Sequence, residues 1–167
     1  DDITTYYTKN TENYMNSLQK VFNICVNDEE CNAEYPKLEE TYYKVISDLK
    51  ENPITVSVDK NLVASGSFTF NSEDFKIVIQ QALYNKQLVE VIPLLINQFH
   101  AKNKDALGSL VAAFSSLLQM DYGAYYCISC NEVLQNNVLE EFKQNASKFK
   151  KIQGGLSFYK SDFDVCN

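Results

Sequence analysis

Apolar residues recur at three- and four-residue steps along most of this 167-residue chain, and this spacing limits the fold more than any other feature. Side chains spaced in this way share one face of an α-helix. The predicted apolar faces run from Tyr14 to Cys25, Leu38 to Leu49, Phe75 to Leu83, Leu88 to Phe99, Leu107 to Leu118 and Val138 to Phe149. The sequence therefore predicts a mainly α fold of about six helices.

A β-hairpin is predicted around residues 54–70, where the helical spacing stops. Apolar and polar residues alternate from Ile54 to Asp59 and again from Ser67 to Phe70. A polar stretch, Asp59-Lys60-Asn61, lies between the two runs. Two alternating runs joined by a polar turn are typical of an antiparallel pair of strands.

The last third of the chain is less regular. Around residues 124–130 it is rich in Tyr, Ile and Cys and follows Gly123, which we expect to end the preceding helix. These residue types favour strands, so we expect a short extended segment there. We expect Gly154-Gly155 to end the last helix, and a polar, aromatic tail to run from there to Asn167.

No internal repeat or flexible linker interrupts the chain, so we expect a single domain over residues 1–167. The formal net charge is −7, and all fifteen basic residues are Lys. This balance argues against a nucleic-acid partner, because phosphate contacts need a basic patch and base recognition relies on Arg. No apolar run approaches the ~20 residues of a membrane-spanning helix.

The single histidine, His100, restricts catalytic chemistry. A Ser-His-Asp or Cys-His system would have to use it, and a His-rich metal site is impossible. His100 lies near the end of a predicted helix, where we expect a structural role. The chain has no G-x-S-x-G nucleophile motif. We therefore assign it no catalytic residue, metal site or cofactor, and a cysteine enzyme using Cys127 with His100 is the alternative.

Five cysteines in a chain of this size suggest disulfides, if the compartment is oxidising. A Cys25–Cys31 bond would close a polar loop between two helices and stabilise the fold by roughly 2.4 kcal/mol. A Cys130–Cys166 bond would close a longer loop and contribute roughly 3.8 kcal/mol, which would leave Cys127 unpaired. The alternative is that all five cysteines are reduced and buried as small apolar side chains.

Two short motifs are less specific. Cys127-Ile128-Ser129-Cys130 has the C-x-x-C spacing of redox and zinc sites. In an extended segment residues three apart point to opposite faces, and no second Cys/His pair occurs, so we expect neither chemistry. Asn145-Ala146-Ser147 is a glycosylation sequon, which is informative only in a eukaryotic protein.

A series of motifs in a fixed order links the chain to a known family. The motifs are Cys25-Val-Asn-Asp28-Glu-Glu-Cys31, Tyr35-Pro36-Lys37-Leu38, Asn52-Pro53-Ile54-Thr55-Val56, Leu83-Tyr84, Val91-Ile92-Pro93-Leu94-Leu95-Ile96 and Tyr126-Cys127-Ile128-Ser129-Cys130-Asn131-Glu132. In this order they resemble the lid, or cap, region of α/β-hydrolase-fold serine peptidases of the tripeptidyl aminopeptidase and proline iminopeptidase type. The resemblance spans nearly the whole chain.

The resemblance implies a helical lid that is not catalytic on its own. In the family the nucleophile Ser lies upstream of the lid, and the Asp and His lie downstream. The implied partner is therefore an α/β-hydrolase core, and the implied substrate is a peptide. The resemblance also implies the pairing Cys130–Cys166. We expect the parent protein to be secreted or periplasmic.

The resemblance also suggests substrate-binding residues. An aminopeptidase must recognise the free ammonium of a peptide, which a partly buried carboxylate does through a charge-assisted hydrogen bond. We assign this role to Glu132, which lies in the family-like segment; the alternative is that it caps the next helix or stays solvated. Tyr84, Tyr125 and Tyr126 are expected to line the pocket, with ordinary packing as their alternative.

The alternative function is a free-standing secreted helical binding or interaction module with no enzymatic role. Such a module would have a closed core and an apolar groove for lipid or peptide. A lid would instead expose the apolar patch that meets its core, and its two termini would lie close together.

Overall fold

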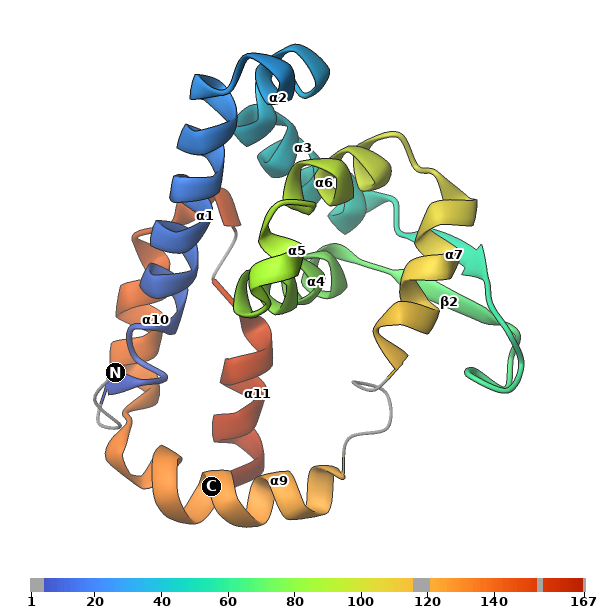
Figure 1. Cartoon of the computed structure of the whole chain (residues 1–167). Helices are drawn as coiled ribbons and strands as arrows, with labels where there is room; N and C mark the ends of the chain where they lie inside the picture. The colour runs from blue at the N-terminus through green and yellow to red at the C-terminus, as the bar shows by residue number, and fades with distance from the viewer. Residues whose placement is uncertain (1–4, 116–120, 153–154, 167) are drawn as a thin grey trace. The chain divides into compact units, whose positions relative to one another are not determined.

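The computed structural model of the chain describes residues 5–115, 121–152 and 155–166. Within these ranges it has ten α-helices and one antiparallel pair of strands (Figure 1). The prediction of a mainly α fold with a hairpin around 54–70 is confirmed. The helices outnumber the about six expected, partly because Asp28 and Asn85 cap two short helices, α2 (Glu29–Glu34) and α5 (Lys86–Val89).

The contacts between residues divide the chain into two compact units. Unit 1 comprises residues 1–17 and 120–167, and unit 2 comprises residues 18–119. The chain passes from unit 1 to unit 2 inside helix α1 (Asn10–Asn27). The prediction of a single domain over residues 1–167 stays a prediction.

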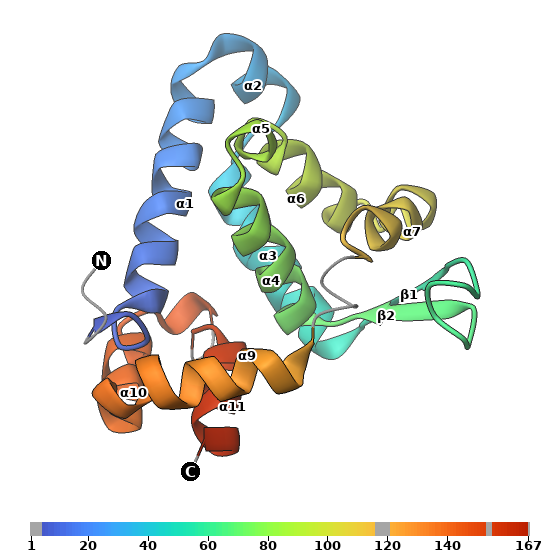
Figure 2. The same ribbon diagram turned by 60° about the horizontal axis from the view of Figure 1, so that its bottom comes forward.

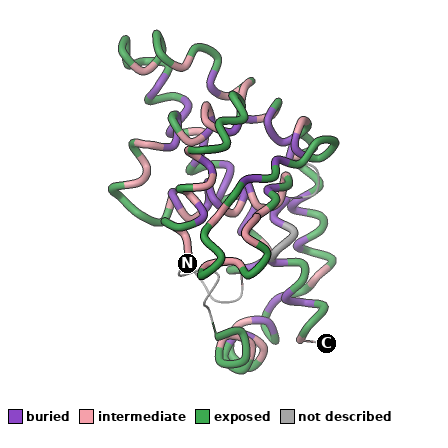
Figure 3. The backbone as a smooth tube through the Cα atoms, turned by 90° about the vertical axis from the view of Figure 1, so that its right-hand side faces the viewer, coloured by how far each residue is buried: buried purple, intermediate pink, exposed green. Residues whose placement is uncertain are grey.

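Unit 2 packs helices with a short hairpin. Its further elements are α3 (Leu38–Glu51), β1 (Ile54–Ser57), β2 (Ser67–Phe70), α4 (Ser72–Tyr84), α6 (Ile92–His100) and α7 (Lys104–Ala113). Helices α3 and α4 lie side by side, and α7 lies beside the hairpin (Figure 2). Buried and exposed stretches follow one another along the helices (Figure 3), as expected for elements with one apolar face.

Aromatic rings form the core of unit 2. Phe75 lies between Tyr42 and Phe99, with ring centroids 5.4 and 4.8 Å away. Phe99 also meets Phe70 of the hairpin edge to face at 5.2 Å, and Phe22 packs on Tyr42 at 5.7 Å. All five side chains are buried. Such ring pairs each contribute about 0.5–1.5 kcal/mol beyond the burial of their area.

A disulfide joins Cys25 at the end of α1 to Cys31 in α2, with a Cα–Cα distance of 5.1 Å. The Asp28 carboxylate accepts a hydrogen bond from the Cys31 backbone N–H at 2.8 Å and caps α2. The segment predicted as a polar loop therefore contains the start of helix α2, which Asp28 caps and the disulfide ties to α1. The alternative in which all five cysteines are reduced is wrong.

Unit 1 is built from the start of α1 and the chain after residue 120. Its elements are α9 (Tyr122–Ile128), the π-helical turn η2 (Ser129–Val133), the 3-10 turn η3 (Leu134–Asn136), α10 (Leu139–Ser147), the 3-10 turn η4 (Lys150–Ile152) and α11 (Ser157–Cys166). Gly155, at φ +81°, lies before α11. A Cβ at this position would lie 2.5 Å from the Thr11 hydroxyl oxygen, so glycine allows the close packing there.

Two predictions for this region are wrong. The segment around 124–130 is helical rather than extended, because Asp121 accepts a hydrogen bond from the Ala124 N–H and starts α9. Gly123, which was expected to end the preceding helix, lies instead in the first turn of α9. The expected tail is helix α11. The predicted apolar positions Leu117 and Leu118 lie outside the described residues.

Candidate functional site

A buried carboxylate lies at the centre of unit 1. Asp162 of α11 is 0% exposed, and its Oδ2 atom accepts hydrogen bonds from the hydroxyls of Tyr7 at 2.8 Å and Tyr125 at 2.7 Å. The Tyr126 hydroxyl donates to Oδ1 at 3.3 Å. These donors come from the segment before α1 and from α9, so one carboxylate joins three parts of the chain. We call these four residues the tyrosine–aspartate cluster.

Aromatic packing surrounds Tyr7 within this cluster. Its ring meets Tyr159 at 5.2 Å and Phe163 at 5.5 Å, both edge to face and both from α11. The rings of Tyr125 and Tyr126 meet each other at 5.1 Å. Tyr7 is buried among these rings, so its hydroxyl is shielded from water, which strengthens its hydrogen bond to the carboxylate.

Burial changes the acidity of the tyrosines. Burial raises the pKa of Tyr125 to about 12, and the Asp162 carboxylate contributes to the rise. The pKa of Tyr7 is raised as well, again mainly by burial and then by its hydrogen bonds to Tyr125 and Asp162. Raised pKa values keep these hydroxyls protonated and able to donate.

A disulfide joins α11 to the turn η2, which directly follows α9, one helical turn beyond Asp162. Cys130 of η2 bonds to Cys166 with a Cα–Cα distance of 5.2 Å, and Cys166 is four residues after Asp162. Cys127 is free and exposed. The segment from Tyr126 to Glu132 is therefore held by a covalent bond at Cys130 and by the hydrogen bond from Tyr126 to Asp162.

Glu132 lies in η2 and is exposed. Its backbone carbonyl accepts a hydrogen bond from the Asn136 side chain at 3.3 Å. The carboxylate that the structure brings to Tyr125 and Tyr126 is Asp162, and sequence reasoning missed it. The sequence contains a signal for the helix that carries Asp162. Leu156, Tyr159 and Phe163 have the spacing of a helix that buries one face.

Tyr84 does not belong to the unit that holds this cluster. It is the last residue of α4 in unit 2, and its side chain is 65% exposed. Of the four predicted substrate-binding residues, Tyr125 and Tyr126 contact each other in unit 1. The substrate-binding roles of Glu132, Tyr84, Tyr125 and Tyr126 stay predictions.

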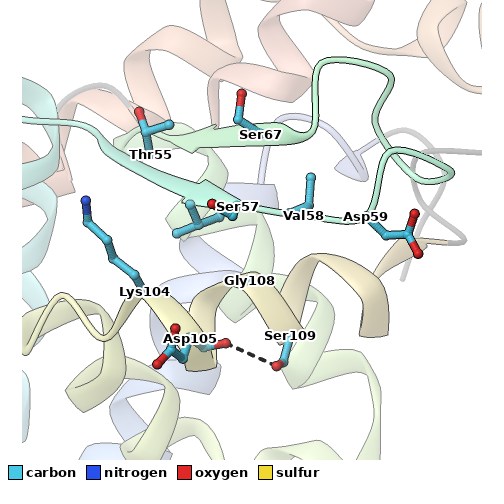
Figure 4. A pocket seen from close by; sticks show the side chains of 10 residues that line it. Thr55, Ser57, Val58, Asp59, Ser67, Lys104, Asp105, Gly108 and Ser109 are labelled. Atoms are coloured by element: carbon cyan, nitrogen blue, oxygen red, sulfur yellow. Dashed lines mark hydrogen bonds between the residues drawn. The ribbon is translucent and has the colours of Figure 1, made fainter.

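Unit 2 has a pocket of about 620 Å³ between the hairpin and α7 (Figure 4). Most lining side chains are polar, with Thr55, Ser57 and Ser67 from the strands and Lys104 from α7. Gly108 permits the close contact at this boundary, because a Cβ there would lie 2.8 Å from the Ser57 carbonyl oxygen. The pocket is open and polar, unlike the apolar groove expected of a lipid-binding module.

Several other sequence features have definite places. His100 is exposed at the end of α6. Asn145, the acceptor of the glycosylation sequon, is buried and donates its side-chain N–H to Glu12 at 3.1 Å, so the folded unit does not present it.

Across residues 5–115, 121–152 and 155–166, no group of three or more His, Cys, Asp or Glu side chains is placed to hold a metal ion. In those ranges no helix is long and apolar enough to cross a membrane.

The site thus combines a buried carboxylate, three tyrosine hydroxyls, a disulfide and a π-helical turn that exposes Asn131 and Glu132. π-helical turns occur frequently at functional sites. Comparison of the chain with protein-family models, with curated proteins and with solved structures finds no match.

Proposed function

We propose that this chain is the substrate-selecting lid of a secreted or periplasmic α/β-hydrolase-fold serine aminopeptidase. The observation that carries the proposal is the Cys130–Cys166 disulfide, which is the pairing that the family resemblance implies. One of its two cysteines, Cys130, lies in the segment from Tyr126 to Glu132, which is the last motif of the ordered series. Two disulfides are also compatible with an oxidising compartment.

A second observation supports an inserted domain. Both ends of such a domain must return to the same core, so its first and last segments have to lie together. Here Tyr7, near the start of the described chain, hydrogen-bonds to Asp162 of the last helix and packs against Phe163. The tyrosine–aspartate cluster therefore holds the two terminal segments of unit 1 side by side.

In this proposal the core and the lid have separate roles. The partner core supplies the serine nucleophile and its Asp and His, and the lid covers them, excludes water and shapes the substrate pocket. Glu132, exposed on the π-helical turn, accepts hydrogen bonds from the ammonium group of the peptide. The tyrosine–aspartate cluster and the disulfide act indirectly, because they fix the turn that carries Glu132.

The gene provides the most direct test. We expect its reading frame to encode a G-x-S-x-G motif upstream of this segment, and an Asp and a His downstream. A reading frame that has no such motif on either side of these residues would contradict the proposal.

The role of Glu132 is tested separately in the full-length parent enzyme. Glu132→Gln should raise KM for peptides with a free amino terminus by roughly 10- to 100-fold, because a hydrogen bond to a charged group is lost. N-acetylated substrates should be unaffected. Glu141→Gln, at an exposed acidic position of α10, is the matched control. Equal effects of Glu132→Gln on both substrate types would contradict the assignment.

A further inference from the structure

Three cysteines gather where α9 and η2 meet the end of α11. Cys130 and Cys166 form the disulfide, and Cys127 is a free, exposed thiol three residues before Cys130. The backbone between Cys127 and Cys130 is right-handed helical, since both Ile128 and Ser129 have α-region dihedral angles. The C-x-x-C motif therefore lies on one helical run, and one of the two reasons for setting it aside, an extended backbone, does not hold.

The helical run brings Cys127 within bonding range of Cys130. Cα atoms three residues apart in a helix are separated by about 5 Å. Disulfides span Cα distances of about 4.4–6.8 Å, so this pair satisfies the main geometric requirement. Closing the bond also requires the two Cβ atoms to approach by about 1–2 Å from their helical spacing, a local adjustment at the junction of α9 with η2.

We propose that Cys127 opens the Cys130–Cys166 disulfide by intramolecular thiol–disulfide exchange, which makes this bond a redox-neutral switch. The Cys127 thiol loses its proton to solvent, and its sulfur attacks the Cys130 sulfur. The Cys127–Cys130 bond forms as the Cys130–Cys166 bond breaks, and Cys166 leaves as a thiolate that takes a proton from solvent. One disulfide replaces another, so no external oxidant or reductant is consumed.

The exchange would change what holds unit 1 together. In the starting form Cys166 ties the C-terminal turn of α11 to η2. In the exchanged form the bond is local to the α9–η2 run, and α11 is held mainly by its packing and by Asp162 one turn earlier. Release of Cys166 thus loosens the end of the helix that carries the tyrosine–aspartate cluster.

The chain is well suited to a direct test by peptide mapping. Cleavage after lysine leaves Cys127 and Cys130 together in peptide 105–143 and Cys166 in peptide 161–167. The purified chain is incubated at mildly alkaline pH without reductant, quenched with acidic N-ethylmaleimide and digested without reduction. In the starting form the two peptides stay linked and Cys127 is alkylated. The proposal predicts a growing fraction of peptide 161–167 that is released and alkylated at Cys166.

Cys127→Ser is the matched control, because serine keeps the shape of an exposed side chain and removes the attacking thiol. We expect released, alkylated 161–167 to be at least about tenfold more abundant in the unmodified chain than in this variant. The rate at which the unmodified chain forms the released peptide should not depend on protein concentration, because the exchange is intramolecular. Equal release in both chains, no release, a rate that rises with concentration, or linked peptides alkylated at Cys130 would each overturn the proposal.

Discussion

The two units of this protein are stabilised around different kinds of centre. Unit 2 has an apolar centre, where Phe75 lies between Tyr42 and Phe99 and every ring is buried. At the centre of unit 1 lies a carboxylate, Asp162, which three tyrosine hydroxyls satisfy. Burying a charge costs several kcal/mol unless hydrogen bonds compensate for the lost hydration. The centre of unit 1 therefore depends on a few directed hydrogen bonds, whereas the centre of unit 2 depends on buried area and shape.

This difference bears on the proposed function. An apolar core tolerates substitutions that keep its volume, while a satisfied polar cluster fixes one arrangement of the helices that contribute to it. The polar cluster lies in the unit that carries the family-like segment from Tyr126 to Glu132. A site that has to present Glu132 in one orientation would benefit from this kind of support.

We expect the largest loss of stability from a substitution in the apolar centre of unit 2. Phe75→Ala should destabilise unit 2 by about 3–5 kcal/mol, because it leaves a cavity among packed rings. Urea unfolding measures the loss, and hydrogen exchange should show lower protection in α3, α4 and α6. Tyr84→Ala, which truncates an exposed aromatic on the same helix as Phe75, should change stability by no more than about 0.5 kcal/mol. Similar losses for the two variants would contradict the assignment of the core.

The two disulfides allow a comparison between the units. Replacing Cys130 and Cys166 with Ser should cost roughly 3.8 kcal/mol, and replacing Cys25 and Cys31 roughly 2.4 kcal/mol, because the first bond closes the longer loop. Urea unfolding of each double variant gives the two values. The reverse order would mean that the unfolded chain is not the main source of the stabilisation.

The fold of unit 2 could be predicted from sequence because its signals are local. Ile54 and Val56 alternate with polar residues in the strand they form, and their pairing with Phe70 and Phe68 follows from a single turn. Helix α3 buries Leu38, Tyr42 and Leu49 at the expected spacing. In each case the residues that decide the structure lie within one element or one connection.

Unit 1 was harder to predict because its decisive contacts are distant in sequence. The Tyr and Cys content of α9 favours a strand, but the Asp121 cap and the bond from Tyr125 to Asp162 select a helix. Tyr7 and Asp162 are 155 positions apart, so no local pattern reveals their hydrogen bond. The pairing of Cys130 with Cys166 was one candidate from the positions of the cysteines, and the predicted family resemblance also implied it.

Removing the charge of Asp162 tests the polar centre of unit 1. Asp162→Asn keeps one acceptor oxygen but replaces the other with an N–H group that faces tyrosine donors. Stability should fall by about 1.5–3 kcal/mol, the value of hydrogen bonds to a charged group. Asp164→Asn, at an exposed position of the same helix, should stay within about 0.5 kcal/mol. An unchanged unfolding free energy for Asp162→Asn would mean that the carboxylate is not needed in its charged form.

Alkaline pH should also distinguish the two units, because both tyrosines with a strongly raised pKa lie in unit 1. The pKa of Tyr125 rises from 10.0 in the unfolded chain to about 12, and that of Tyr7 rises too. Above pH 10 the unfolded chain therefore releases these protons first, so stability is complete below pH 10 and falls as pH rises through 12. Urea unfolding across this range measures the slope. Tyr7→Phe with Tyr125→Phe should flatten it, whereas Tyr84→Phe, which alters an exposed ring of unit 2, should not. An equal slope in all three chains would place the alkaline loss outside the tyrosine–aspartate cluster.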